Sequence, residues 1–455
     1  MSNLALLGNR LDSAEFLPEL VSDATCQLKS LKIPSFSLSI QSLSLLSRNC
    51  PFMENLHFGG CRDSSIQEIV SADLKFPSLK SLNVRDIPDE LLVKLTDSRN
   101  LTNLTLGSKI PETSLRRLSN LCPNLLELNC RIQLNTLTVR FFADIVMVYF
   151  SQLKSITVRF RPVTRRRGEP SILDFYPTRK PVVPANLQSV NIETKNYLSV
   201  PSAARFAFSN LLQGVTRLQF RWLKLECLLD CPALVELELA CVTFTNLGAG
   251  FRVGPYLGSL TIKDSTKVDH GRIITREGNI IPSLSYLSLP ILLAEIPFTF
   301  GSYIRVFPTL KSVELFIISC ADPDFSVVCG QNLGKQLGSL LSLGKLGLRP
   351  TTDLLPFNAQ KSILKSLAGQ RKQLIKSGQH LKLLEYIFVT KRNGRELLVK
   401  LDSETQKGAR MKATANLCDQ TSRDTFFGNS FIHKDFQPTP ENCIIVEDES
   451  CFITV

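Results

Sequence analysis

The sequence predicts an α/β solenoid in which short parallel strands alternate with returning helices. Three observations predict this fold. A six-residue template with apolar residues at positions 1, 4 and 6 recurs along the chain, proline often stands two residues before it, and the intervening segments carry helical spacing. Because one strand and one helix are too small to bury their apolar faces alone, neighbouring units must stack.

The template occurs fourteen times between residues 28 and 389. The copies are LKSLKI (Leu28), MENLHF (Met53), LKSLNV (Leu79), LTNLTL (Leu101), LLELNC (Leu125), LKSITV (Leu153), LQSVNI (Leu187), VTRLQF (Val215), LVELEL (Leu234), LGSLTI (Leu257), LSYLSL (Leu284), LKSVEL (Leu310), LGKLGL (Leu343) and LEYIFV (Leu384). Successive starts are 19 to 41 residues apart. Most lie near the period of about 20–29 residues that is typical of leucine-rich repeats.

Proline precedes seven of the fourteen copies by two residues, at positions 51, 77, 123, 232, 255, 282 and 308. Proline cannot continue a helix and favours an extended conformation in its predecessor, so it marks the exit from a helix before the next strand. Helical spacing lies between the strands, for example at Leu115, Leu118 and Leu121.

Packing distances then predict the shape of the stack. Parallel strands lie about 4.8 Å apart, whereas packed helices need about 8–10 Å, so the stack bends. We therefore expect a leucine-rich-repeat solenoid, or horseshoe, with a parallel β-sheet on the concave face and helices on the convex face. About 14–15 irregular repeats occupy residues 1–400. Residues 401–455, where the leucine period stops, are expected to form a flexible or disordered tail.

Composition excludes several classes of protein. With 44% hydrophobic and 21% charged residues the chain is globular. It has no run of eighteen apolar residues, which argues against a membrane span, and no basic segment followed by an apolar core that would indicate a secretory signal. Its thirteen cysteines are therefore expected to be reduced thiols in the cytoplasm or nucleus.

The net charge of +12 is concentrated in two stretches, residues 154–180 and 361–400. The first contains a Pro- and Arg-rich insertion, residues 159–183, with the run Arg165, Arg166 and Arg167. We expect a solvated loop there, the alternatives being a phosphate contact or a nuclear-import patch. The second has helical spacing at Ile363, Leu364 and Leu367 and predicts a long helix that covers the last strands.

Side chains alternate along a strand, so template positions 3, 5 and 7 are expected to face the concave surface. The candidate partner-binding residues on that surface are His57, Arg85, Asn129, Arg131, Arg159, Arg217, Arg221, Glu236, Glu238 and Tyr286. The same rule places Tyr386 and Phe388 there in the last copy. The arginines at 131, 159, 217 and 221 form a basic stripe that favours a partner of opposite charge. The alternative is solvated polar cover for the sheet.

Three segments carry a family resemblance: NCPFMENLHFGGCRDSSIQEIV (49–70), LCPNLLELNC (121–130) and DCPALVELELAC (230–241). They resemble the cysteine-containing repeats of F-box/leucine-rich-repeat proteins. The resemblance implies a non-enzymatic substrate-recognition component of an SCF-type ubiquitin ligase, whose F-box docks on the ligase core. Leu17-Pro18 is not followed by a matching Trp, and residues 1–6 already fit the template. An upstream segment or another chain is therefore expected to supply the F-box and cover that edge.

No catalytic, metal or cofactor constellation is present in the sequence. The four histidines are widely spread, and Cys227 and Cys231 lack a second ligand pair. In the tail, Ile444, Ile445 and Val446 precede three acidic residues and resemble a SUMO-interacting motif, which would add a strand to its partner. The sequence thus predicts a protein-binding module rather than an enzyme. The alternatives are a repeat scaffold or inhibitor with no ligase link, and a nucleic-acid-associated protein that uses the Arg-rich insertion.

Overall fold

The computed structural model is an α/β protein. It describes residues 3–5, 27–61, 65–96, 98–110, 112–134, 152–162, 186–200, 205–245, 248–263, 273–275, 281, 283–292, 307, 309–318, 323–350, 357–379, 385–392, 395–401, 413–417 and 445–446. The chain forms two compact units. Unit 1 comprises Met1–Leu234, Ala240–Val253 and Val268–Ile273; unit 2 comprises Val235–Leu239, Gly254–Lys267 and Ile274–Val455.

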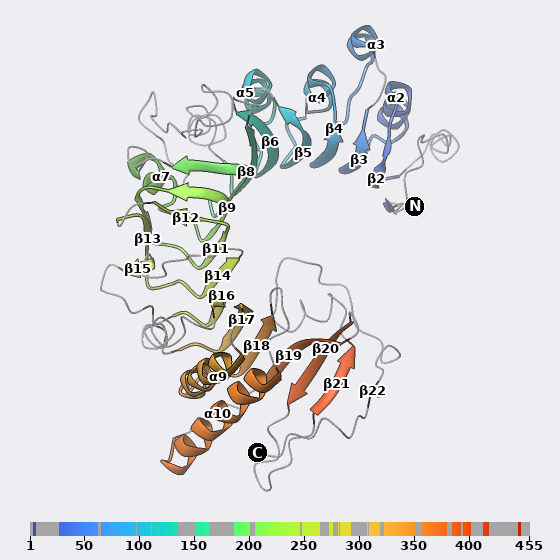
Figure 1. Cartoon of the computed structure of the whole chain (residues 1–455). Coiled ribbons are helices and arrows are strands. Elements are labelled where there is room, and N and C mark those ends of the chain that lie inside the picture. The colour runs from blue at the N-terminus through green and yellow to red at the C-terminus, as the bar shows by residue number, and fades with distance from the viewer. Residues whose placement is uncertain are drawn as a thin grey trace. The chain divides into compact units, whose positions relative to one another are not determined.

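Unit 1 is built on a parallel sheet in which strands that are consecutive in sequence are neighbours (Figure 1). The strands are β1 (Asn3–Ala5), β2 (Ser30–Ser37), β3 (Asn55–Gly60), β4 (Ser81–Asp86), β5 (Asn103–Ile110), β6 (Glu127–Leu134), β7 (Ser155–Pro162), β8 (Ser189–Val200) and β9 (Arg217–Leu225), with β12 (Thr243–Phe244) beside the end of β9. The helices of this unit are α2 (Ile40–Asn49), α3 (Ile66–Ser71), α4 (Asp89–Thr96), α5 (Glu112–Leu121) and α7 (Arg205–Leu211). In Figure 1, α2 to α5 lie on one side of the strands that they connect.

The strand register follows the sequence template. Position 4 forms a single row across β2 to β9, made by Leu31, Leu56, Leu82, Leu104, Leu128, Ile156, Val190 and Leu218. In the thirteen copies from Leu28 to Leu343, every residue at positions 1, 4 and 6 is at most 2% exposed. The predicted facing of the template is therefore confirmed, and these apolar rows form the core.

A tight turn leads into many of the strands. The backbone N–H of position 1 donates to the carbonyl three residues earlier, as from Met53 to Cys50 (3.1 Å) and from Leu125 to Cys122 (3.2 Å). Pro51 and Pro123 are the second residues of these turns, a position that suits the fixed φ of proline. The proline thus starts the turn into the strand, which is a more specific role than the helix exit predicted from the sequence.

The next two residues tie each unit to the one before it. The N–H groups of positions 2 and 3 both donate to the position-2 carbonyl of the preceding unit. Lys80 and Ser81, for example, donate to the carbonyl of Glu54 at 2.8 and 2.9 Å. The same pair recurs from β3 to β9 in unit 1 and at β14, β16, β17 and β18 in unit 2. The repeats that contain these strands are therefore joined to the preceding repeat by the same backbone hydrogen bonds.

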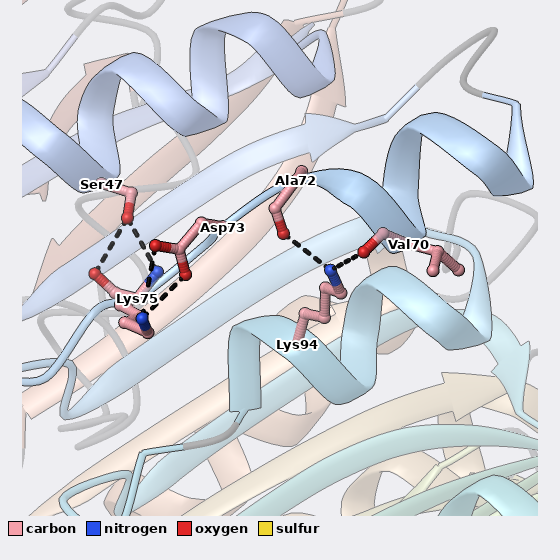
Figure 2. Close-up of polar contacts among 6 residues, drawn as sticks. All are labelled: Ser47, Val70, Ala72, Asp73, Lys75 and Lys94. Carbon is pink, nitrogen blue, oxygen red and sulfur yellow. Dashed lines mark hydrogen bonds and ion pairs between the residues drawn. The ribbon is translucent and has the colours of Figure 1, made fainter.

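Side chains on the helical side also join successive units (Figure 2). Lys94 in α4 donates from Nζ to the carbonyls of Val70 and Ala72, both at 2.6 Å, at the C-terminal end of α3. Ser47 in α2 both accepts from the N–H of Lys75 (2.8 Å) and donates to its carbonyl (3.0 Å). A cation at a helix C-terminus satisfies carbonyls that the helix leaves unpaired and complements its dipole.

A small sheet replaces a helix in one part of unit 1. β10 (Leu228–Cys231) pairs in parallel with β13 (Gly250–Val253), and β15 (Ile273–Thr275) follows β13 as the third strand of this sheet. The template starts at Val215 and Leu234 are only 19 residues apart, which leaves little room for a helix between them. The ring of Phe251 in β13 packs against that of Phe220 in β9, with 6.0 Å between their centroids.

Unit 2 continues the strand pattern. Its strands are β11 (Glu236–Ala240, of which Ala240 belongs to unit 1), β14 (Ser259–Lys263), β16 (Tyr286–Leu292), β17 (Ser312–Ile318), β18 (Lys345–Pro350), β19 (Glu385–Arg392), β20 (Arg395–Leu401), β21 (Ala413–Leu417) and β22 (Ile445–Val446), and β15 (Ile273–Thr275) spans the boundary of the units. β14, β16, β17, β18 and β19 are parallel neighbours in that order, and β19 to β22 pair antiparallel. The helices are α9 (Pro323–Gly338) and α10 (Phe357–Lys376).

Two expectations for this region need correction. The long helix predicted within residues 361–400 ends at Lys376, and β19 and β20 follow it. In β19 the register differs from the template by one residue, because Tyr386 and Phe388 are the Cα partners of Leu346 and Leu348. The register therefore places both aromatic residues in the rows of buried leucines, not in the rows expected to bind a partner. The flexibility of residues 401–455 stays a prediction, since most of them lie outside the described residues.

Three glycines allow α9 and α10 to approach closely. A Cβ on Gly330 would lie 2.9 Å from the carbonyl oxygen of Ala359, and one on Gly334 would overlap the carbonyl oxygen of Ile363. A Cβ on Gly338 would lie 2.8 Å from Cβ of Gln370. The backbones of the two helices thus pack without an intervening side chain. Among the helices that the structure describes, none is long and apolar enough to cross a membrane.

Candidate protein-binding surface

The face of the unit 1 sheet opposite the buried rows carries template positions 3, 5 and 7 of β2 to β9, and we call it the open face. Position 5 forms a row made by Lys32, His57, Asn83, Thr105, Asn129, Thr157, Asn191 and Gln219. Lys32 is exposed and the other seven are half-buried. Short amide and hydroxyl side chains dominate this row, so the open face presents hydrogen-bond donors and acceptors at intervals of about 4.8 Å.

Arginines gather at one end of the open face. At position 7, Arg131 pairs in register with Arg159, Arg159 with Glu193, and Glu193 with Arg221. Arg217, at position 3 of β9, is exposed. We call Arg131, Arg159, Arg217 and Arg221 the arginine patch. The structure thus brings together the four arginines of the predicted basic stripe, and it places Glu193 among them.

Glu193 forms an ion pair within this patch. Its Oε2 atom lies 3.1 Å from Nε of Arg159, and the two side chains are 34% and 38% exposed. An ion pair this exposed is screened by water and adds little to stability, at most about 1 kcal/mol.

The only tryptophan of the chain follows directly after Arg221. Trp222 is 40% exposed, and its φ of 59° lies in the left-handed region, which costs a residue with a Cβ about 1–2 kcal/mol. The hydroxyl of Thr194 donates to its carbonyl at 2.7 Å, next to an interruption of the β8–β9 register between Glu193 and Leu198. Sequence reasoning missed Trp222 as a site residue, although an exposed tryptophan beside arginine is typical of binding hot spots.

The open face as a whole is positive. It carries six cationic residues, which are Lys32, Arg85 and the four of the arginine patch, and two anionic residues, Glu127 and Glu193. Its net charge is therefore four positive units, with His57 neutral. At positions 3, 5 and 7 of β2 to β9 there is no Phe, Tyr or Trp. The face is suited to polar and electrostatic contacts more than to aromatic stacking.

His57 and Arg85 lie at the other end of the open face, on β3 and β4. Burial lowers the pKa of His57 below its ordinary value, and the positive charges of Lys32 and Arg85 lower it further. Arg85 is exposed. Because β5 separates β4 from β6, these two predicted residues are not part of the arginine patch.

The remaining predicted contact residues, Glu236, Glu238 and Tyr286, belong to unit 2. Glu238 forms an ion pair with Lys263, with 3.1 Å between Oε1 and Nζ. The hydroxyl of Tyr286 donates to Oε2 of Glu314 at 3.0 Å, and Glu314 is only 6% exposed. Within unit 2, acidic side chains thus have partners on the neighbouring strands β14 and β16.

Most of the other candidate residues lie outside the part of the chain that the structure describes. Arg165, Arg166 and Arg167 of the basic insertion, and Ile444 of the tail motif, lie outside the described residues. Ile445 and Val446 form β22, which pairs antiparallel with Asn416 and Ala415 of β21. Within the described ranges, no group of three or more His, Cys, Asp or Glu gathers as it would around a metal ion.

The eight described cysteines are free thiols, and all but Cys61 are buried. Burial raises the pKa of Cys130 to about 12 and that of Cys227 to about 11, and it also raises the pKa of Cys231. Cys122 donates from Sγ to the carbonyl of Thr96 at 3.4 Å. These raised pKa values keep Cys130, Cys227 and Cys231 protonated as packing groups rather than as thiolate nucleophiles or ligands.

No protein-family model and no curated protein matches this chain. The open face and the resemblance carried by its repeats are the features that bear on its function.

Proposed function

We propose that this chain is a leucine-rich-repeat solenoid of the horseshoe type and that it binds a partner protein on its open face, without catalysis of its own. One observation carries the proposal. The same template positions fall into register across eight consecutive strands, so that polar rows lie over a continuous apolar core. A rigid face of this kind is organised before binding, which lowers the entropy lost on association.

The resemblance to F-box/leucine-rich-repeat proteins gives the proposal a more specific form. In it, the solenoid recognises the substrate of an SCF-type ubiquitin ligase, and an F-box in another segment or chain docks on the ligase core. Cys50-Pro51, Cys122-Pro123 and Cys231-Pro232 support the likeness, because each pair begins the turn into a strand. Without the ligase link, the same surface would make the chain a scaffold or an inhibitor.

Affinity purification of the intact chain followed by mass spectrometry tests the binding surface. Thr105→Glu places a charged carboxylate at a half-buried position in the middle of the open face, where it also lowers the positive charge of the face, and we expect it to abolish recovery of the partner. Gln67→Glu is the matched control, since Gln67 is exposed on α3 at the helical side. Recovery of the partner by both variants would refute the proposal.

The same experiment tests the ligase link. Co-purification of ligase-core subunits with the partner supports the substrate-recognition role, whereas recovery of the partner without them supports the scaffold. A chain truncated after Leu401 separates the tail from the solenoid. If truncation alone removes the partner while Thr105→Glu retains it, the tail is the binding segment and the proposed surface is wrong.

A further inference from the structure

We infer that the partner presents an acidic, extended polypeptide segment to the arginine patch on β6 to β9. This inference rests on the proposed function of the open face and adds the chemistry of its partner. It is carried by the charges of the patch, the polar row beside it, the distance between the arginines, and the lack of stacking surfaces.

The charges favour a carboxylate-rich partner. Arg131, Arg159 and Arg221 project from the same row of the sheet, and Arg217 adds a fourth guanidinium on β9. Guanidinium groups bind carboxylates through paired hydrogen bonds, and charge complementarity steers the encounter and suppresses partners of the wrong charge. The ion pair of Arg159 with Glu193 shows that a carboxylate already fits at this position.

The polar row beside the patch suits the backbone of an extended chain. Asn129, Thr157, Asn191 and Gln219 lie in register on the same four strands. All four side chains are half-buried, so their amide and hydroxyl groups are partly accessible on the open face. Side-chain amides both donate to and accept from a peptide backbone, so this row would hold the segment while the arginines bind its side chains.

The spacing of the strands sets the length of the segment. From Arg131 on β6 to Arg221 on β9 there are three strand intervals, or about 14 Å at about 4.8 Å each. An extended chain advances about 3.4 Å per residue, so about five residues cross the patch. Successive side chains of such a segment point to opposite sides, and two or three acidic residues would therefore face the arginines.

The same surface is poorly suited to nucleic acid. Proteins that bind single strands offer a series of aromatic faces for the bases, and positions 3, 5 and 7 of β2 to β9 have no Phe, Tyr or Trp. Glu127 and Glu193 would repel phosphates within the cationic surface. Trp222 stands at the end of the row as a single aromatic side chain, which fits one anchoring contact with a peptide.

Trp222 also makes the inference directly testable. It is the only tryptophan, it adjoins Arg221, and it is 40% exposed, so its fluorescence reports ligands at the patch. We would titrate the intact chain with a blocked peptide of alternating Asp and Glu of about five residues. The control peptide has the same length with Asn and Gln. We expect a saturable change in emission with the acidic peptide alone, and weaker binding as NaCl is raised from about 0.05 to about 0.5 M.

Two variants locate the site. Arg159→Gln combined with Arg221→Gln should lower the affinity for the acidic peptide by at least about tenfold, because two charge-assisted contacts are lost. Lys32→Gln combined with Arg85→Gln is the matched control, since it removes two exposed cationic side chains from the other end of the same face, and the affinity should change less than about twofold. Circular dichroism checks that all variants are folded.

The inference is overturned if the neutral peptide binds as well, if the double variant binds the acidic peptide normally, or if an oligonucleotide displaces the peptide at equal charge concentration. These outcomes leave the proposed function intact as long as Thr105→Glu still loses the partner that the intact chain recovers. If that partner is retained, the open face itself is wrong, and the two failures are thereby distinguished.

Discussion

Because α9 and α10 approach closely, replacement of glycine by alanine should have opposite effects on stability in the two helices. Gly334→Ala adds a methyl group where α9 meets the backbone of α10 at the carbonyl of Ile363. Gly369→Ala adds the same group in the middle of α10, where no described atom lies within 4 Å of the new Cβ. We expect the first substitution to destabilise the helix pair and the second to stabilise it.

The magnitudes follow from two contributions. Alanine in place of glycine within a helix is favourable by about 1 kcal/mol at either position. At Gly334 the new methyl group meets backbone atoms, which cannot turn away as a side chain can, and overpacking of this kind costs about 3 kcal/mol. The expected changes are therefore a loss of about 2 kcal/mol for Gly334→Ala and a gain of about 1 kcal/mol for Gly369→Ala.

Hydrogen exchange of the α9 and α10 amides is the appropriate measurement. Repeat arrays open locally, so a single unfolding midpoint would average this region with the rest of the chain. Exchange in both helices should become about 30-fold faster in Gly334→Ala, and exchange in α10 about fivefold slower in Gly369→Ala. Equal slowing in the two variants would show that the backbones are not in contact and would refute the packing described for α9 and α10.

Three other predictions concern unit 1. Leu104→Ala should lower the free energy of unfolding by about 2–5 kcal/mol because Leu104 is 1% exposed in the core, whereas Thr105→Ser on the open face should be nearly silent in the same denaturation experiment; equal losses would contradict the assigned facing. Lys94→Met should lower stability by about 1 kcal/mol by removing the donor to the end of α3, and Lys75→Met, which breaks only an exposed ion pair, should have almost no effect. The folded state lowers the pKa of His57 below 6.5, so its neutral form contributes stability that is complete above pH 6.5 and is lost as the pH falls through the folded-state pKa. His57→Gln should therefore flatten the dependence of the free energy of unfolding on pH in this range. An unchanged slope would argue against a neutral, half-buried imidazole.

The strand rows could be predicted from the sequence because the template leaves only one register. In LTNLTL, from Leu101, the apolar residues at positions 1, 4 and 6 alternate with polar residues, so a slip by one residue would bury Thr and expose Leu. The structure buries Leu101, Leu104 and Leu106 as expected. Alternation between apolar and polar residues therefore fixed both the facing and the pairing across β2 to β9.

The last copy shows where this reasoning fails. LEYIFV, from Leu384, has apolar residues at five of its six positions, so two registers bury nearly equal apolar surface. The alternation of apolar and polar residues therefore does not distinguish the two registers. In the structure, Tyr386 is the Cα partner of Leu346 in β18. Composition alone was equally unable to show that β10 and β13 replace a helix, although the 19-residue spacing was a usable signal.

The candidate site was predicted in part. The four arginines were identified by strand alternation, and the same rule places Glu193 at position 7 of the copy that starts at Leu187, but its ion pair with Arg159 became visible only in the structure. Trp222 follows no periodic rule, because it stands where the backbone leaves the regular strand with positive φ. Irregular positions of this kind become visible only when the strands are paired.

The ion pair between Arg159 and Glu193 bears on the kinetics of the proposed recognition of an acidic segment. A carboxylate tethered to the neighbouring strand occupies Arg159 before any partner arrives, so an incoming acidic side chain must replace it rather than fill an empty site. In the proposed complex, such an exchange would give a smaller net gain of contacts than binding to an unoccupied guanidinium, and affinity differences of this kind appear mostly in the dissociation rate. Glu193 would then act as an internal competitor, and Glu193→Gln should slow the dissociation of the acidic peptide.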